Sequence, residues 1–310
     1  MSDPQPIATI DLDFLGLAEA IAVFALAGPQ GTVLVECGPM STLPRLVAQL
    51  AARGITPADV TDVLVTHVHL DHAGSAGWWA RSGARIHVHR RGYQHLADPT
   101  RLIASASRVY GADMGRFWGD MPAAPEAHLV AHDDGDRISA GGLAIRCIDT
   151  PGHARHHLCF ALERALFTGD IAGIRLPGQL AAVAPTPPPD IDIAAWLGSL
   201  ERIRRQQASR LFLTHFGEVV DADAHLDRVR DALSAAAARV ADGLSRGLLR
   251  EALIDDFAAW SRAVLAAQGV TGPILDAYLA ANPPPMAVDG LMRYLGQQGN
   301  PPPAAAYAHA

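Results

Sequence analysis

The sequence predicts an α+β fold that is followed by a C-terminal helical region. From about residue 7 to residue 217, short apolar runs bounded by glycine, proline or aspartate alternate with amphipathic segments, as strands and helices do. Beyond that point the apolar residues recur only at helical spacing. The chain has 310 residues, of which 49% are hydrophobic, so it is long enough for one large domain with a helical appendage.

Three strands open the predicted sheet. They cover Ile7 to Phe14, Ala20 to Leu26 and Thr32 to Glu36. A Gly-Pro-Gln-Gly turn at residues 28–31 joins the last two, so we expect the sheet to begin with antiparallel strands. A helix from Leu43 to Ala52 follows, because its leucines share one side and a glycine ends it.

The segment Thr66–Gly74 places three histidines and an aspartate at the end of an apolar run that predicts a buried strand. His67 and His69 are two residues apart, so in an extended chain both imidazoles point to the same side and can bind one ion. Asp71 and His72 follow where the chain turns, and they can serve a neighbouring ion. Imidazole and carboxylate are ligands that suit Zn²⁺, so the segment predicts a metal site.

A helix from Ser75 to Arg81 and a strand from Arg85 to His89 should follow this segment. His87 and His89 repeat the two-residue spacing of the metal segment. Two arginines come next in place of an aspartate–histidine pair, so we do not expect these histidines to bind a metal.

Three further candidate ligands each follow an apolar run and lie beside a glycine. They are His153, Asp170 and His215. The strands predicted in this part of the chain are Leu143 to Ile148, His157 to Leu162, Ala165 to Thr168 and Leu211 to Leu213. A strand that ends at a polar residue delivers that side chain to a sheet edge, where a site can form.

The order HxHxDH, then a lone histidine, a lone aspartate and a final histidine, resembles the signature of the metallo-β-lactamase superfamily over about residues 7 to 217. The resemblance implies an αββα metallo-β-lactamase sandwich. It also implies that seven side chains bind two metal ions. The first metal is held by His67, His69 and His153, the second by Asp71, His72 and His215, and Asp170 bridges both.

Glu36 departs from the family pattern, in which an aspartate usually follows the early strands. We expect its longer side chain to make hydrogen bonds that support the metal ligands. A surface glutamate at a strand end is the alternative.

The ligand set implies a metal-dependent hydrolase with a binuclear centre. Two divalent ions, with Zn²⁺ favoured although Fe or Mn accept the same ligands, share a water and lower its pKa. The bridging hydroxide would attack the carbonyl or phosphoryl group of a small ester, thioester, lactone or phosphotriester. Asp170 would set the spacing of the ions, and Asp71 is the candidate that receives or relays the proton.

Other branches of the family fit this chain less well. β-Lactamases carry cysteine or serine where Asp170 stands, and the ligand set instead resembles glyoxalase II, the lactonases and the phosphotriesterase-like members. Gly173 occupies the position where quorum-signal lactonases typically have tyrosine. The alternative of a different reaction class is a mononuclear iron persulfide dioxygenase-like enzyme, in which the resemblance implies one iron on His67, His153 and Asp170.

Residues 92–125 leave the alternation of strands and helices and predict a helical insertion. Insertions over a metal site often form a wall of the substrate pocket. We therefore take Tyr110 and Trp118 as candidate pocket residues, together with Phe216, which follows the ligand His215. Packing within the insertion is the alternative role of its aromatic side chains.

The C-terminal part of the chain predicts helices only, with no strand after Gly217. The loop from Leu176 to Pro189 is apolar and rich in proline, and we expect it to rim the active site. Asp190 or Asp192 then caps a helix that covers one face of the sheet.

We expect a catalytic domain at residues 1–220, with the insertion at about 92–125, and a helical extension at residues 221–310 that ends in a mobile tail at 301–310. The extension either caps the active site or forms the interface of a homodimer. The sequence leaves these two roles open.

Composition narrows the class of partner and the compartment. The net charge of -7 and a pI near 6.0 offer no basic stripe, so we expect a small-molecule substrate and no nucleic acid. Cys37, Cys147 and Cys159 lie far apart, which predicts buried free thiols and neither disulfides nor a thiolate zinc site. With no secretory signal and no apolar run long enough for a membrane span, the expected location is cytoplasmic.

Overall fold

The computed structural model describes residues 6–298, which form two compact units. The first unit comprises residues 6–149, His156–Gly169 and Ser209–Glu218, and the second comprises Thr150–Arg155, Asp170–Ala208 and residues 219–298. The tail at residues 301–310, for which the sequence predicts mobility, lies outside the described residues.

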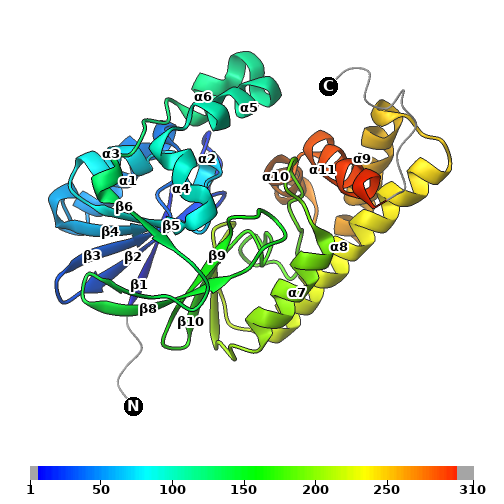
Figure 1. The fold of residues 1–310 in the computed structure, drawn as a ribbon. Helices are drawn as coiled ribbons and strands as arrows, with labels where there is room; N and C mark the ends of the chain where they lie inside the picture. The colour runs from blue at the N-terminus through cyan, green and yellow to red at the C-terminus, as the bar shows by residue number, and fades with distance from the viewer. Residues whose placement is uncertain (1–5, 299–310) are drawn as a thin grey trace. The chain divides into compact units, whose positions relative to one another are not determined.

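One six-stranded sheet has the order β1-β2-β3-β4-β5-β6 (Figure 1). Its strands are β1 (Ile7–Asp11), β2 (Ala22–Gly28), β3 (Gly31–Val35), β4 (Val60–Leu64), β5 (Arg85–His89) and β6 (Leu129–His132). The first three strands pair in antiparallel fashion, which confirms the prediction, and β3 to β6 are parallel to their neighbours. Parallel strands end at the same edge, so the residues that follow β3 and β4 lie close together.

The other six-stranded sheet has the order β12-β11-β10-β9-β8-β7. Its strands are β7 (Arg137–Ala140), β8 (Leu143–Asp149), β9 (Leu158–Leu162), β10 (Ala165–Gly169), β11 (Arg210–Leu213) and β12 (Gly217–Val219). The strands β7 to β10 pair in antiparallel fashion, whereas β10 and β11 are parallel.

The sequence did not predict β6, β7 or β12, and the expectation of no strand after Gly217 is wrong. All three strands are at sheet edges and span four residues or fewer. Edge strands are often short and have a neighbour on one side only, so little alternation of apolar and polar residues develops in them.

Alternate residues of β2 and β3 pack into two different apolar cores of the first unit. Phe24 lies between the sheets, with its ring centroid 5.5 Å from that of Phe167 and 5.3 Å from that of Phe212. On the opposite face, Val23 packs in a cluster with Trp79 and other residues of the helical layer. A helical layer and two sheets, together with the C-terminal helices, confirm the α+β class and the predicted sandwich.

The helices of the first unit include the predicted insertion. They are α1 (Leu43–Ala51), α2 (Leu70–Ala73), α3 (Ala76–Arg81), α4 (Arg90–Ala97), α5 (Thr100–Tyr110) and α6 (Met114–Trp118), with 3₁₀ turns at Met40–Thr42, Pro57–Asp59, Gly111–Asp113 and Glu126–His128. The helices α4, α5 and α6 make up the insertion, whose helical character is confirmed.

The second unit contains the five remaining described helices. They are α7 (Ile193–Arg204), α8 (Ala222–Ser245), α9 (Arg250–Ala267), α10 (Gly272–Ala281) and α11 (Pro284–Gln297). Asp192 caps α7, because its carboxylate accepts a hydrogen bond from the Ala195 amide at 3.0 Å. Leu176 and Ala181 of the proline-rich segment share an apolar cluster with Leu265 of α9. The division into domains at residues 1–220 and 221–310 stays a prediction.

Cys37, Cys147 and Cys159 are buried free thiols, as the sequence predicts. Burial raises the pKa of Cys37 and of Cys147 to about 12, so both stay protonated at neutral pH. A protonated thiol is a poor nucleophile and a poor metal ligand.

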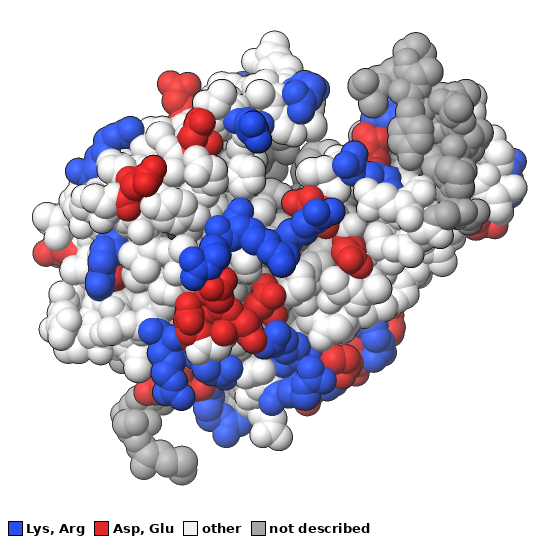
Figure 2. Space-filling model, viewed as in Figure 1, with Lys and Arg blue, Asp and Glu red and all other residues white. Residues whose placement is uncertain are grey.

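Charged side chains of both signs adjoin one another on the face drawn in Figure 2. Exposed ion pairs such as Arg90 with Asp133, at 2.7 Å, contribute little to the free energy of unfolding. Among residues 6–298, no helix combines the length and the apolar character that crossing a membrane requires.

Replacing Gly77 of α3 with alanine should destabilise the first unit by about 1 to 3 kcal/mol, because the new methyl group would collide with the main-chain carbonyl of Pro122. Gly198 of α7 is a matched control, since a methyl group there meets nothing within 4 Å and Gly198→Ala should stabilise its helix by about 1 kcal/mol. Denaturant unfolding measures both changes. Equal stability of the two variants would contradict the close approach at Gly77.

Candidate metal centre

A buried carboxylate, Glu36, organises the centre of the first unit. It follows β3, has no exposed surface and has the left-handed backbone angle φ of 66°. Its oxygens accept hydrogen bonds from the Thr66 amide (3.2 Å) and hydroxyl (2.5 Å), from His72 Nδ1 (3.0 Å) and from the Thr214 hydroxyl (3.2 Å). The supporting role expected for Glu36 is confirmed, and the alternative of a surface glutamate is wrong.

These hydrogen bonds determine which ring nitrogen of His72 faces the site. Because Nδ1 donates to Glu36, the lone pair of Nε2 is left for a ligand. This Nε2 lies 3.5 Å from Asp71 Oδ2. His215 has the same arrangement, since its Nδ1 donates to the Ala20 carbonyl at 2.7 Å and its Nε2 lies 3.4 Å from Asp71 Oδ2. A cation bound among these three side chains would pair with His72 Nε2, His215 Nε2 and Asp71 Oδ2.

His67 and His69 lie between β4 and α2, and His69 is the residue directly before α2. The Nε2 atom of His67 is 2.9 Å from the Nδ1 atom of His69, and the two rings meet edge to face with centroids 4.4 Å apart. The structure therefore confirms that the two-residue spacing brings both imidazoles together.

His153 and Asp170 are neighbours within the second unit. His153 Nδ1 donates to the Pro185 carbonyl at 3.0 Å, so its Nε2 carries the lone pair. This Nε2 lies 3.3 Å from Asp170 Oδ2. The ring of Trp196 meets the His153 ring edge to face, with centroids 5.5 Å apart. Hydrogen bonding and packing thus fix the orientation of His153.

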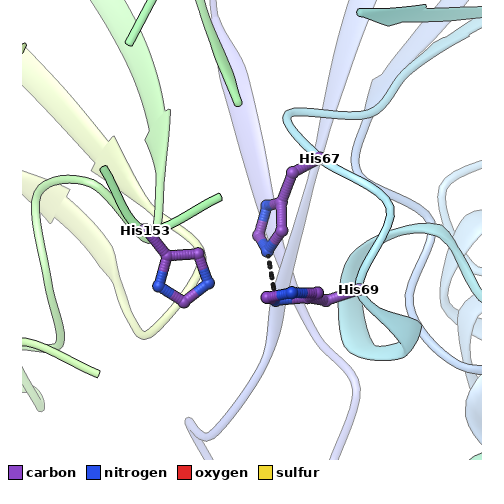
Figure 3. Close-up of side chains that lie close together, drawn as sticks. All are labelled: His67, His69 and His153. Carbon is purple, nitrogen blue, oxygen red and sulfur yellow. Dashed lines mark hydrogen bonds between the residues drawn. The ribbon is translucent and has the colours of Figure 1, made fainter. Parts of the chain in front are cut away.

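Three groups of candidate ligands have their ligand atoms within 4.8 Å of one another; Figure 3 shows the first group. The groups are His67, His69 and His153; His67, His72 and Asp170; and Asp71, His72 and His215. All seven side chains that the sequence singles out occur among these groups. Their assignment to individual metals stays a prediction.

The donor set fits a divalent ion. Two ligand atoms on one tetrahedral zinc ion are about 3.3 Å apart. The separations between neighbouring ligand atoms given above run from 2.9 Å to 3.5 Å. Nitrogen and carboxylate oxygen atoms at these separations suit zinc, iron or manganese.

The candidate pocket residues have different surroundings. Tyr110 of α5 packs edge to face on Trp118, with centroids 5.1 Å apart, and Trp118 stacks on Phe14 at 5.2 Å. Burial raises the pKa of the Tyr110 hydroxyl well above its usual range, and the nearby Asp71 carboxylate raises it further. Tyr110 is therefore a neutral donor close to a candidate ligand. Phe216 packs against the core between the sheets. A substrate contact of any of the three stays a prediction.

The neighbouring histidines have structural partners. His87 lies between Asp62 and His132, with ring nitrogens 2.9 Å from the carboxylate and 2.8 Å from the second imidazole. His157 is buried and stacks on His67, with centroids 5.1 Å apart. Such contacts support the sheet and the candidate ligand His67.

Sequence reasoning missed Trp196 as a residue of the site. It lies in the helix that the sequence predicts after Asp192, and its indole N–H donates to the Ile171 carbonyl at 2.7 Å, one residue after Asp170. A main-chain acceptor leaves no trace in a sequence, so no signal could have identified this contact.

The sequence profile of the family described as the Metallo-beta-lactamase superfamily matches residues 18–215. The Metallo-beta-lactamase fold-containing protein ST1585 of Sulfurisphaera tokodaii is 30% identical over 190 residues, which cover 59% of this chain and 68% of that protein. The Atrochrysone carboxyl ACP thioesterase of Aspergillus fumigatus is 31% identical over 128 residues, which cover 41% of this chain and 31% of that protein.

A solved structure with a similar fold is the metallo-beta-lactamase family protein TTHA1429 of Thermus thermophilus. It superposes with a TM-score of 0.63 at 20% sequence identity, over 95% of this chain and 93% of that chain. At this identity the likeness concerns the fold alone.

Replacing Glu36 with glutamine should weaken zinc binding by about 10- to 100-fold. The amide NH₂ of glutamine is a donor, and it would face the Thr66 hydroxyl and His72 Nδ1, which are donors to Glu36 in the wild type. Chelator competition measures the affinity. Glu163→Gln is the matched control, since Glu163 is exposed and also has a left-handed φ, of 52°. Wild-type zinc affinity in Glu36→Gln would contradict the role of Glu36.

Proposed function

Because this chain belongs to the metallo-β-lactamase superfamily, we propose that it is a binuclear metal-dependent hydrolase. The observation that carries the proposal is the third group of candidate ligands, Asp71, His72 and His215. A mononuclear enzyme would have no use for it. The substrate would be a small ester, thioester, lactone or phosphotriester.

Seven side chains would hold two zinc ions, with iron or manganese as the other candidates. His67, His69 and His153 would bind the first ion, Asp71, His72 and His215 the second, and Asp170 both. When bound, the ions supply a hydroxide nucleophile near neutral pH and stabilise the negative charge that develops on the substrate oxygen.

Asp71 is the side chain best suited to handle the proton. Its carboxylate is 21% exposed, whereas that of Asp170 is 5% exposed. Greater exposure allows Asp71 to pass a proton to the leaving group or to water, while Asp170 stays fixed. The Nε2 atoms of His72 and His215 lie 3.5 Å and 3.4 Å from the same oxygen of Asp71, Oδ2.

Neutral groups of the insertion would act on the substrate. The protonated Tyr110 hydroxyl can donate a hydrogen bond to a substrate oxygen near Asp71. Phe14, which is partly exposed and stacks on the buried Trp118, would offer an apolar surface for a hydrocarbon group.

Thioesters are the first substrate class to test, because one relative of this chain carries the name thioesterase. That match spans 31% of the relative, so the likeness does not establish the substrate of this chain. Thioester hydrolysis is part of our proposal. Lactones, simple esters and phosphotriesters complete the panel.

The decisive experiment counts metals and follows hydrolysis in the same samples. The purified protein should contain two metals per chain, lose turnover when a chelator removes them, and regain it with zinc. His215→Ala should lose the second metal and lower kcat by about 100-fold or more. His128→Ala is the matched control, since His128 also faces a main-chain carbonyl, that of Ala84 at 3.2 Å.

One iron per chain, with oxygen consumed in the presence of a persulfide, would replace this proposal with the dioxygenase alternative. Full activity of His215→Ala would show that the group of Asp71, His72 and His215 takes no part in the reaction.

A further inference from the structure

Two buried side chains from helices α7 and α8 hold the main chain directly after Asp170. The indole Nε1 of Trp196 donates to the Ile171 carbonyl at 2.7 Å, and His225 Nε2 donates to the Ala172 carbonyl at 2.8 Å. Neither Trp196 nor His225 has exposed surface. Consecutive carbonyls after one candidate ligand are therefore fixed from two different helices.

The same segment makes a tight turn that leaves it little freedom. The Gly173 amide donates to the Asp170 carbonyl at 2.9 Å. Gly173 has a φ of 70°, and a Cβ atom there would lie 2.6 Å from the Val183 carbonyl oxygen. Ile174 and Val183 exchange two main-chain hydrogen bonds, of 2.8 and 3.0 Å. A shift of either held carbonyl would therefore move Asp170 itself.

His225 carries an energetic cost that packing alone does not explain. Its Nε2 must carry the proton, because a carbonyl oxygen only accepts, and its Nδ1 has no hydrogen-bond partner among the described residues. An unpaired buried acceptor destabilises the folded chain, because it has lost its hydrogen bonds to water. Burial also lowers the pKa of His225 to about 4, so the imidazole is neutral at pH 7. An apolar residue would avoid this cost but could not hold the Ala172 carbonyl.

Trp196 also contacts the other candidate ligand of the second unit. Its ring packs edge to face on His153. Gly152 precedes His153 and lies so close to the main chain of Trp196 that any Cβ atom there would collide with it. The Asp192 amide, at the start of α7, donates to the Gly152 carbonyl at 2.8 Å. One helix therefore orients both His153 and Asp170.

We propose that Trp196 and His225 are positioning residues of the metal centre, which hold the Asp170 carboxylate in its orientation through the carbonyls of Ile171 and Ala172. The proposal rests on the proposed role of Asp170 as a shared ligand. Under this proposal α8, a helix of the C-terminal region, contributes a residue that positions a metal ligand.

The test compares two replacements of His225 in the full-length protein. His225→Leu removes the donor, and zinc binding should weaken by about 10- to 100-fold. The visible spectrum of the cobalt-substituted protein should change with it. His225→Gln places an amide N–H where Nε2 stands, so affinity and spectrum should return towards those of the wild type.

Tyr278→Phe is the matched control for a purely structural effect. The Tyr278 hydroxyl accepts from the Leu176 amide at 3.0 Å and donates to the Ala181 carbonyl at 2.7 Å, so it holds the same loop farther from Asp170. This variant should lose thermal stability and keep its zinc affinity and cobalt spectrum. If it loses zinc affinity as His225→Leu does, general loosening of the loop explains both and the positioning role is wrong.

A second variant keeps the test decisive if His225→Leu does not fold. Trp196→Phe removes the indole donor, keeps a smaller aromatic ring beside His153, and should weaken zinc binding in the same direction. Asp170→Asn separates this proposal from the proposed function. If Asp170→Asn keeps both metals, the ligand assignment fails; if it loses metal while His225→Leu and Trp196→Phe bind zinc as the wild type does, only the positioning role fails.

Discussion

The hydrogen bonds of Glu36 are the constraint on which the first unit depends. A carboxylate without exposed surface is costly unless donors surround it, and here the donors come from three places in the chain. Thr66 follows β4 of one sheet, and Thr214 follows β11 of the other. Because one side chain requires both, the ends of these strands must converge. The candidate ligands next to them are therefore brought together by the same contacts that stabilise the fold.

Main-chain carbonyls decide how the histidines present their lone pairs. The Ala20 carbonyl accepts from His215 and the Pro185 carbonyl accepts from His153, so both rings direct Nε2 towards a carboxylate. A loop that moved either carbonyl would allow the other tautomer and leave a proton where a metal should bind. Loops that carry no ligand therefore have a direct effect on the chemistry.

The local parts of this structure could be predicted from the sequence, and the long-range ones could not. The contact of His67 with His69 could be predicted because the two residues are only two positions apart in the sequence. The role of Glu36 needed a family resemblance, since its partner Thr214 is far away in the sequence. The contact of His225 with the Ala172 carbonyl could not be predicted from the sequence, because every residue has a main-chain carbonyl that could accept the hydrogen bond. Short edge strands were missed for a similar reason, as pairing rather than composition defines them.

Neither compact unit is a continuous stretch of chain, since the boundaries between them fall after residues 149, 155, 169, 208 and 218. A single genetic crossover therefore cannot exchange one unit for a counterpart from another gene. Divergence of such a protein has to proceed by point substitution and by changes in loop length, and the insertion formed by α4, α5 and α6 is one place where length can change within a single unit. Chimeras designed at any one of these boundaries would split a unit instead of transferring it.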